Sequence, residues 1–208
     1  MLRRAIEYTY VLTSPPDYDE IGLDPDRQQA QYRTFLRETL CLMKPTSAIA
    51  TLVTTDRKSG GIVHQKHVEI TNIMRALNYR LVAQKVWMKS QKANLYRLNY
   101  AFVLTFARVE RLPRAIAKKH AALPDVLTYA PEVISITASE PYHNAFPLAL
   151  ARTLIDTYTL SGDVVYDPFV GSGTTLVAAL QSKRTAIGSE IDKTLARVAE
   201  RRAQEATT

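Results

Sequence analysis

The 208-residue sequence has a single cysteine, four histidines and seven glycines, and it lacks an apolar run of membrane-spanning length. The one cysteine, Cys41, excludes a disulfide framework and a thiolate cluster for structural zinc, which favours a reducing compartment. His64 and His67 lie three residues apart on a predicted helix, but without a third ligand nearby they predict no metal site. We therefore expect a soluble cytoplasmic protein without a membrane segment or a bound metal.

Positive charge is concentrated in one part of a chain whose formal net charge is +7. Residues 80–120 carry ten lysines and arginines against one acidic residue, Glu110. A solvated basic face would explain this segment, but contact with nucleic-acid phosphates is the sharper interpretation. The residues assigned to DNA binding are Lys89, Lys92, Arg97, Arg111, Arg114, Lys118 and Lys119.

The periodicity of apolar residues predicts alternating strands and helices. Expected strands cover residues 5–12, 47–54, 80–88, 99–106, 164–166 and 185–189, and expected helices cover 26–43, 63–77, 146–158, 174–182 and 193–204. This alternation predicts an α/β fold with a mostly parallel sheet, in one domain that spans residues 1–208. Residues 108–142 contain four prolines and little periodicity, so we expect them to form a small insertion or lid.

A glycine-containing loop lies between a predicted strand and a predicted helix, at residues 167–175 (DPFVGSGTT). Open α/β sheets bind ligands at such turns, and an acidic residue after the next strand can hold a ribose. Glu190 stands at that place. The glycines could instead only shape the turn, whereas a phosphate-binding GxxxxGK[ST] loop would need a lysine that is absent.

This loop, together with the Gly-x-Glu-Ile-Asp segment at 188–192, resembles the cofactor motifs of bacterial DNA N4-cytosine and N6-adenine methyltransferases. The resemblance implies S-adenosyl-L-methionine as the cofactor. The residues that it assigns to cofactor binding are Thr13, His143, Phe146, Asp167, Pro168, Phe169, Gly171, Ser172, Gly173, Thr174 and Glu190.

A second motif, Ser14-Pro15-Pro16, resembles the Ser-Pro-Pro-Tyr loop that receives the target base in the same family. It precedes the cofactor motif, an order typical of the circularly permuted β class. The resemblance therefore implies a single Rossmann-like methyltransferase domain, with a mostly parallel sheet, a terminal antiparallel strand, and residues 108–142 as a target-recognition or lid segment. Residues assigned to catalysis are Ser14, Pro15, Pro16, Asp17 and Tyr18.

The fourth motif position departs from the family pattern, because Asp17 replaces the usual aromatic residue and Tyr18 follows one place later. By resemblance, Tyr18 would stack on the flipped base, while Ser14 and the Pro15 carbonyl would accept hydrogen bonds from its amine. Two hypotheses remain for Asp17: a solvated loop carboxylate, or a further acceptor for the amine.

The predicted function is that of a site-specific DNA methyltransferase, of the kind found in restriction-modification systems, which methylates an exocyclic amine of a flipped base. Serine at the first motif position favours cytosine N4 over adenine N6. DNA is the expected partner, and a homodimer or a partner subunit is left open. Only about a dozen residues precede Ser14, where the family normally has a further strand. The alternative is therefore a non-catalytic DNA-binding or partner subunit that retains the fold.

Overall fold

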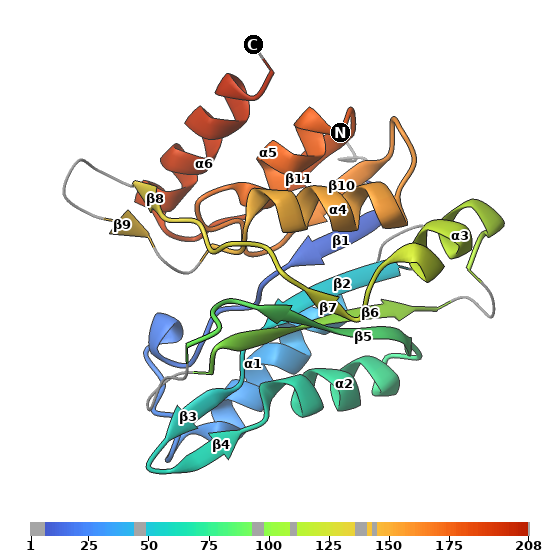
Figure 1. Ribbon diagram of the computed structural model, residues 1–208. Helices are drawn as coiled ribbons and strands as arrows, with labels where there is room; N and C mark the ends of the chain where they lie inside the picture. The colour runs from blue at the N-terminus through green and yellow to red at the C-terminus, as the bar shows by residue number, and fades with distance from the viewer. Residues whose placement is uncertain are drawn as a thin grey trace, which may run out of the picture.

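The computed structural model describes residues 7–43, 49–92, 98–108, 112–135, 141–142 and 145–207. Its described part is built on a seven-stranded sheet with the order β11-β10-β1-β2-β6-β5-β7 (Figure 1). The strands of this sheet are β1 (Tyr10–Thr13), β2 (Ile49–Thr54), β5 (Arg80–Met88), β6 (Tyr100–Ala107), β7 (Val126–Leu127), β10 (Val164–Asp167) and β11 (Thr185–Gly188).

The sheet is mostly parallel, as the alternation of elements predicted. Strands β11, β10, β1 and β2 are parallel neighbours, whereas β6 is antiparallel to both β2 and β5. We expected a terminal antiparallel strand, but the antiparallel strand β6 lies inside the sheet. Seven of the eight residues of β6 are apolar and most are buried, which suits an interior position. The next strand, β5, is covered on its other side, within the described residues, only by the two-residue strand β7, and it carries Arg80 and Gln84 at exposed positions.

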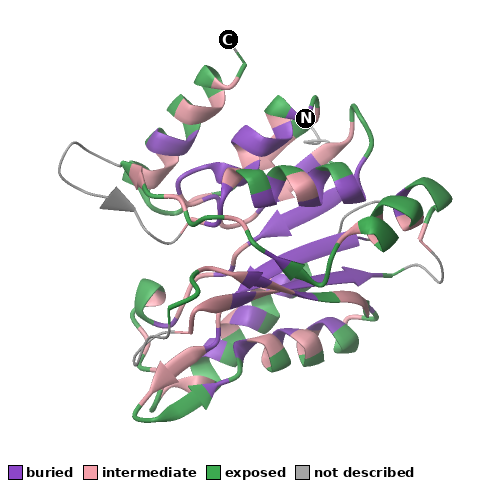
Figure 2. Ribbon diagram, viewed as in Figure 1, coloured by how far each residue is buried: buried purple, intermediate pink, exposed green. Residues whose placement is uncertain are grey.

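Helices cover both faces of the sheet. Helices α1 (Gln29–Leu42) and α2 (Lys66–Ala76) pack on one face, and α3 (Arg114–Ala122), α4 (Leu148–Tyr158) and α5 (Thr174–Gln181) pack on the other. Alternate residues of β1 serve the two layers: Tyr10 and Leu12 join one hydrophobic cluster, and Val11 joins the other. The central strands are therefore buried on both faces (Figure 2). Helix α6 (Lys193–Glu205) packs against α5.

A hairpin occupies part of the predicted helix 63–77. Strands β3 (Arg57–Ser59) and β4 (Ile62–His64) pair through a turn at Gly60 and Gly61, both of which have positive φ. Two adjacent glycines favour this kind of tight turn. The helix α2 consequently begins only at Lys66, so the prediction of its start was wrong by three residues.

Much of the segment 108–142 belongs to the main body of the molecule. Strand β7 pairs with β5, and Ile116 of α3 and Leu127 of β7 are buried in the cluster under α4. Two further short strands, β8 (Ile134–Ser135) and β9 (Pro141–Tyr142), pair with each other. A lid or target-recognition role for this segment stays a prediction.

Candidate active site

Two cavities lie where the parallel strands end. The larger, of about 770 Å³, is lined mainly by the loops that follow β10 and β11. The smaller, of about 340 Å³, is lined by the loops after β1 and β2 and by the end of β5. Carboxyl ends of parallel strands are the usual ligand-binding edge of open α/β sheets. The sheet thus places both sequence motifs at one edge.

The predicted cofactor residues gather around the larger cavity. Those that line it are Phe146, Asp167, Pro168, Phe169, Gly171, Ser172, Thr174 and Glu190. Thr13 and Gly173 do not line it but support the loop from behind, and His143 lies outside the described residues. The carboxylate of Glu190 accepts hydrogen bonds from the backbone N–H of Gly171 at 2.7 Å and of Asp192 at 2.9 Å.

Backbone geometry explains both glycines of this loop. Gly171 has φ 53° and Gly173 has φ 91°, which are left-handed conformations that other residues rarely adopt. A Cβ atom added to Gly173 would lie 2.8 Å from Cα of Ala199 in α6. The same helix holds the loop through Arg202, whose guanidinium donates to the carbonyl of Ser172 at 2.6 Å.

The two motifs are joined by a buried hydrogen bond. The hydroxyl of Thr13, at the end of β1, donates to Oδ1 of Asp167 at 2.6 Å, although the residues are 154 positions apart in the chain. The backbone N–H of Phe169 donates to the same oxygen at 3.0 Å. Burial raises the pKa of Asp167 to about 6, against the lowering effect of these hydrogen bonds.

The cavities meet at the start of the second motif. Ser14, Glu20, Ala145 and Phe146 line both of them. Pro16 lines only the larger cavity, whereas Pro15 and Asp17 line only the smaller one. A group bound in one cavity can therefore face a group bound in the other beside the hydroxyl of Ser14.

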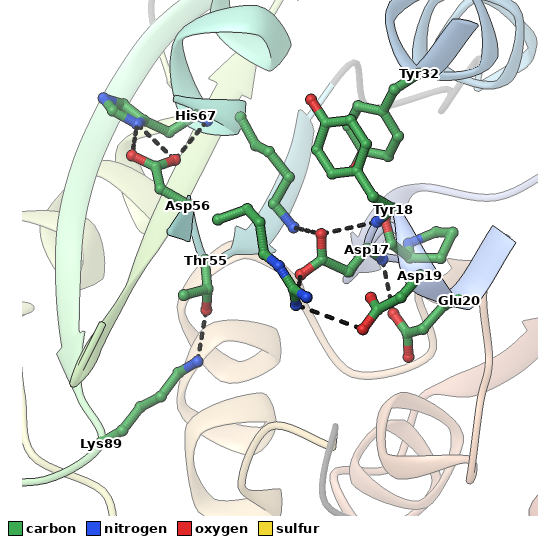
Figure 3. Close-up of polar contacts among 12 residues, drawn as sticks. Asp17, Tyr18, Asp19, Glu20, Tyr32, Thr55, Asp56, His67 and Lys89 are labelled. Atoms are coloured by element: carbon green, nitrogen blue, oxygen red, sulfur yellow. Dashed lines mark hydrogen bonds and ion pairs between the residues drawn. The ribbon is translucent and has the colours of Figure 1, made fainter. Parts of the chain in front are cut away.

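Asp17 is not the solvated carboxylate of the first hypothesis. Its Oδ1 accepts a hydrogen bond from the N–H of Tyr18 at 2.8 Å and lies 3.2 Å from Nζ of Lys66 (Figure 3). Its Oδ2 lies 3.7 Å from Arg57, and its own N–H donates to Glu20 at 2.7 Å. Protein groups therefore largely replace water around the carboxylate of Asp17.

Tyr18 does not fit the stacking role predicted for it. Its side chain is only 3% exposed and lines neither cavity. The ring is stacked on Tyr32 of α1, with the ring centroids 4.0 Å apart (Figure 3). The short 3-10 helix η1 (Asp19–Ile21) begins directly after Tyr18, and Tyr18 itself belongs to the hydrophobic cluster that contains Tyr32 and Leu36 of α1. The aromatic residues that do line the smaller cavity are Trp87 and Phe146.

Several residues of the smaller cavity were not assigned by sequence reasoning. The buried Asp56, two residues after β2, accepts hydrogen bonds from Nδ1 of His67 at 2.7 Å and from its N–H at 3.1 Å. Arg57 and Lys66 line the same cavity. Asp56 and Arg57 have a signal in the sequence, because they closely follow the buried parallel strand β2 at the edge that also holds Ser14, whereas Lys66 comes only after the hairpin.

The predicted DNA-binding residues lie in different places. Lys89 lines the smaller cavity, donates to the hydroxyl of Thr55 at 2.5 Å and lies 5.5 Å from the ring centroid of Trp87. Lys92 is exposed nearby in sequence. Arg97 and Arg111 lie outside the described residues.

The three basic residues of α3 lie away from both cavities. Arg114, Lys118 and Lys119 are exposed, and Lys119 donates to the carbonyl of Asp156 at 2.7 Å. Strand β6, which precedes α3, ends beside the first residue of β2, opposite to the cavity edge (Figure 1). The structure therefore does not bring these residues together with Lys89.

The histidines of the hairpin region have acidic partners. Nε2 of His64 lies 3.0 Å from Oδ1 of Asp26, and Gln29 contacts its other ring nitrogen. Among the described residues, no group of three or more His, Cys, Asp or Glu side chains is arranged to hold a metal ion. In the same part of the chain, no helix is long and apolar enough to cross a membrane.

An open sheet with a glycine loop and an acidic residue after the next strand is a Rossmann-like ligand-binding arrangement, here with a second cavity beside it. The chain belongs to the DNA methylase family of N6/N4 methyltransferases, whose family model matches residues 82–201, more than half of its length. This match contains the glycine loop but not the Ser14 motif.

Curated relatives share short segments with this chain. The Type II methyltransferase M.MjaI of Methanocaldococcus jannaschii is 51% identical over 51 residues, which are 24% of this chain and 17% of that protein. The Escherichia coli K12 protein YubD, assigned as a methylase, is 35% identical over 96 residues, which are 46% of this chain and 37% of that protein. The matched segments thus span well under two thirds of these relatives.

Solved structures resemble the chain over nearly its whole length. TTHA0409 of Thermus thermophilus, assigned as a DNA modification methylase, has a TM-score of 0.70 and 25% identity, with 96% of this chain and 88% of that chain covered. It has also been solved with S-adenosyl-L-methionine. The PvuII cytosine-N4-specific DNA methyltransferase has a TM-score of 0.73 at 17% identity, with 97% and 83% covered, which shows a shared fold.

Proposed function

We propose that this chain transfers a methyl group from S-adenosyl-L-methionine to an exocyclic amine of a flipped DNA base, with cytosine N4 favoured over adenine N6. The observation that carries the proposal is the meeting of two cavities at Ser14. A methyl donor in the larger cavity and a base in the smaller one would face each other there. Catalysis of this kind requires mainly positioning.

The larger cavity fits this cofactor. The carboxylate of Glu190 can accept hydrogen bonds from ribose hydroxyls, and Asp167 adds an acidic wall suited to a cationic ligand. The hydroxyl of Thr174, which lines the cavity, is buried without a hydrogen-bond partner among the described residues. Phe35 and Phe169 supply apolar surface, with ring centroids 5.8 Å apart. The cofactor would supply a methyl group already activated by its sulfonium.

The smaller cavity fits a polar, planar guest. Ser14 and the carbonyl of Pro15 would accept hydrogen bonds from the amine and leave its lone pair aimed at the larger cavity. The buried hydroxyl of Thr54 lines the cavity and has no hydrogen-bond partner in the part of the chain that the structure describes. Glu20 and Asp56 line the cavity, and their carboxylates would accept the proton that the amine loses.

Serine at position 14 supports the preference for cytosine, by resemblance to the Ser-Pro-Pro-Tyr motif. DNA is the proposed partner. The second candidate function, a non-catalytic DNA-binding or partner subunit with this fold, is favoured by the ring of Tyr18, which is buried against Tyr32 and does not line the smaller cavity.

Incubation with tritiated S-adenosyl-L-methionine and mixed genomic DNA, followed by nucleoside analysis, tests the proposal. Labelled N4-methylcytosine is the expected product. Labelled N6-methyladenine would support the enzyme but overturn the base preference. Binding of both ligands without transfer to any DNA would make the non-catalytic subunit the better function.

A further inference from the structure

Lys66 is a buried charge at the wall of the smaller cavity. It is the first residue of α2, and it is only 3% exposed. An ammonium group removed from water is costly unless an anion compensates it. The compensating group is the carboxylate of Asp17, whose Oδ1 lies 3.2 Å from Nζ (Figure 3).

The carboxylate of Asp17 connects three parts of the chain. Besides Lys66 of α2, it contacts Arg57 of β3 and the N–H of Tyr18 in its own loop. Arg57 also lies 3.4 Å from Asp19, so the hairpin and the loop share two ion-pair contacts. Among these partners, Lys66 is the most buried, with a side chain 4% exposed against 35% for Arg57. Its contact is therefore the least screened by solvent.

The loop that carries Ser14 is fastened at both of its ends. Before it, the hydroxyl of Thr13 is bonded to Asp167. After it, the hydroxyl of Tyr32 donates to the carbonyl of Pro16 at 2.7 Å, and Asp17 follows with its ion pair. The acceptor oxygens proposed to hold the amine, on Ser14 and Pro15, lie between these fastenings.

We infer that Lys66 is a positioning residue, which acts through Asp17 to hold Ser14 and Pro15 where the two cavities meet. Asp17 accordingly has a third role, distinct from a solvated carboxylate and from an acceptor for the amine. This inference rests on the proposed function. A methyl transfer is sensitive to small misplacements of the acceptor, so the loss of the pair should slow the reaction more than it weakens binding.

A double-mutant cycle separates this role from direct contact between Lys66 and DNA, which is the competing explanation because Lys66 lines the cavity. The variants are Lys66→Met, Asp17→Asn and the two combined. We expect kcat at saturating DNA and cofactor to fall about 10- to 100-fold in each single variant. The combined variant should be no slower than the worse single variant, and cofactor affinity should stay within about twofold. Multiplied losses would overturn the inference.

Two further variants sharpen the cycle. Lys66→Arg keeps the charge and should restore much of kcat. Arg33→Met is the control: it breaks another ion pair of α2, the 2.8 Å contact between Arg33 and Glu69. Neither residue lines either of the two cavities, so kcat should stay unchanged. If Lys66→Met alone does not fold, the combined variant, which leaves no unpaired buried charge, provides the test. Wild-type kcat in the combined variant would overturn the inference.

Hydrogen exchange gives a readout that does not need catalysis. The amides of Ser14, Asp17 and Tyr18 should exchange faster in Lys66→Met than in wild type, whereas those of the loop 167–175 should not. Wild-type protein that transfers no methyl group would refute the proposed function alone. Wild-type protein that is active, with variants of undiminished kcat and unchanged exchange, would refute only the role of Lys66.

Discussion

The two loops of the site are built by different means. The glycine loop at 167–175 is shaped by its own backbone, because Gly171 and Gly173 have positive φ and the N–H of Phe169 donates to Asp167, and Glu190 and Arg202 hold it further. The loop at 13–18 is held by groups from distant elements, including Tyr32, Lys66 and Asp167. A loop that is shaped by its own backbone leaves a recognisable motif in the sequence. A loop that is held by residues from distant elements can differ from the family motif at single positions.

The largest effect is expected from Gly171→Val, which tests the local loop. A β-branched residue cannot easily adopt φ 53°, and Gly171 lines the larger cavity, so a distorted backbone there would alter the cofactor site. We expect cofactor binding to become undetectable by calorimetry while the protein stays folded. Gly162→Val is the matched control, because Gly162 also has positive φ (87°) but open space around it and no place in the cavity. Retained binding by Gly171→Val would mean that the loop only shapes a turn.

A smaller loss is expected from Ser14→Ala, which tests the loop assembled from a distance. The change removes a contact to the reacting amine, so kcat should fall by about 100-fold, while binding of cofactor and of DNA persists. Ser161→Ala, at an exposed turn, is the control. Transfer rates under saturating ligands provide the measurement, and an undiminished rate would remove Ser14 from the proposed mechanism.

The burial of Asp167 between the two loops can be tested through pH. Because the pKa of Asp167 is raised from 3.8 to about 6 in the folded protein, the folded state binds the proton more tightly, and this group lowers stability as pH rises from about 4 to 6. The loss amounts to about 3 kcal/mol. Asp167→Asn keeps the acceptor oxygen and lacks this pH dependence. The free energy of unfolding, measured with denaturant at several pH values, should rise in the variant relative to wild type as pH increases to 6. The same pH dependence in both proteins would contradict this prediction.

The smallest effect is expected in the salt dependence of DNA binding. If DNA lies over the cavity edge, Lys92→Gln should reduce the slope of log K against log salt by about 0.9, the contribution of one phosphate contact. Lys118→Gln, on the opposite edge of the sheet, should leave the slope unchanged. Titrations at several salt concentrations measure both slopes. A reduced slope for Lys118→Gln would instead place DNA against α3, as the basic segment 80–120 suggested.

The sequence by itself determined the α/β fold and the two motifs, because apolar periodicity and glycine loops are local signals. Strands β1, β2 and β10 and helices α1, α5 and α6 lie within a few residues of the predicted ranges. The placement of Asp167 and Glu190 in one cavity also followed from the rule for parallel strands.

Only the tertiary structure decided how the irregular motif is used. The hairpin β3–β4 is too short for a periodic signal, and its Arg57 meets Asp17 only after folding. From the sequence alone, the ring of Tyr18 could face either a base or the core, and in the structure it packs against Tyr32 in the core. The partner of Asp17 could not be predicted from the sequence, because the ion pair with Lys66 depends on how the start of α2 lies beside the loop after β1 and not on any local pattern.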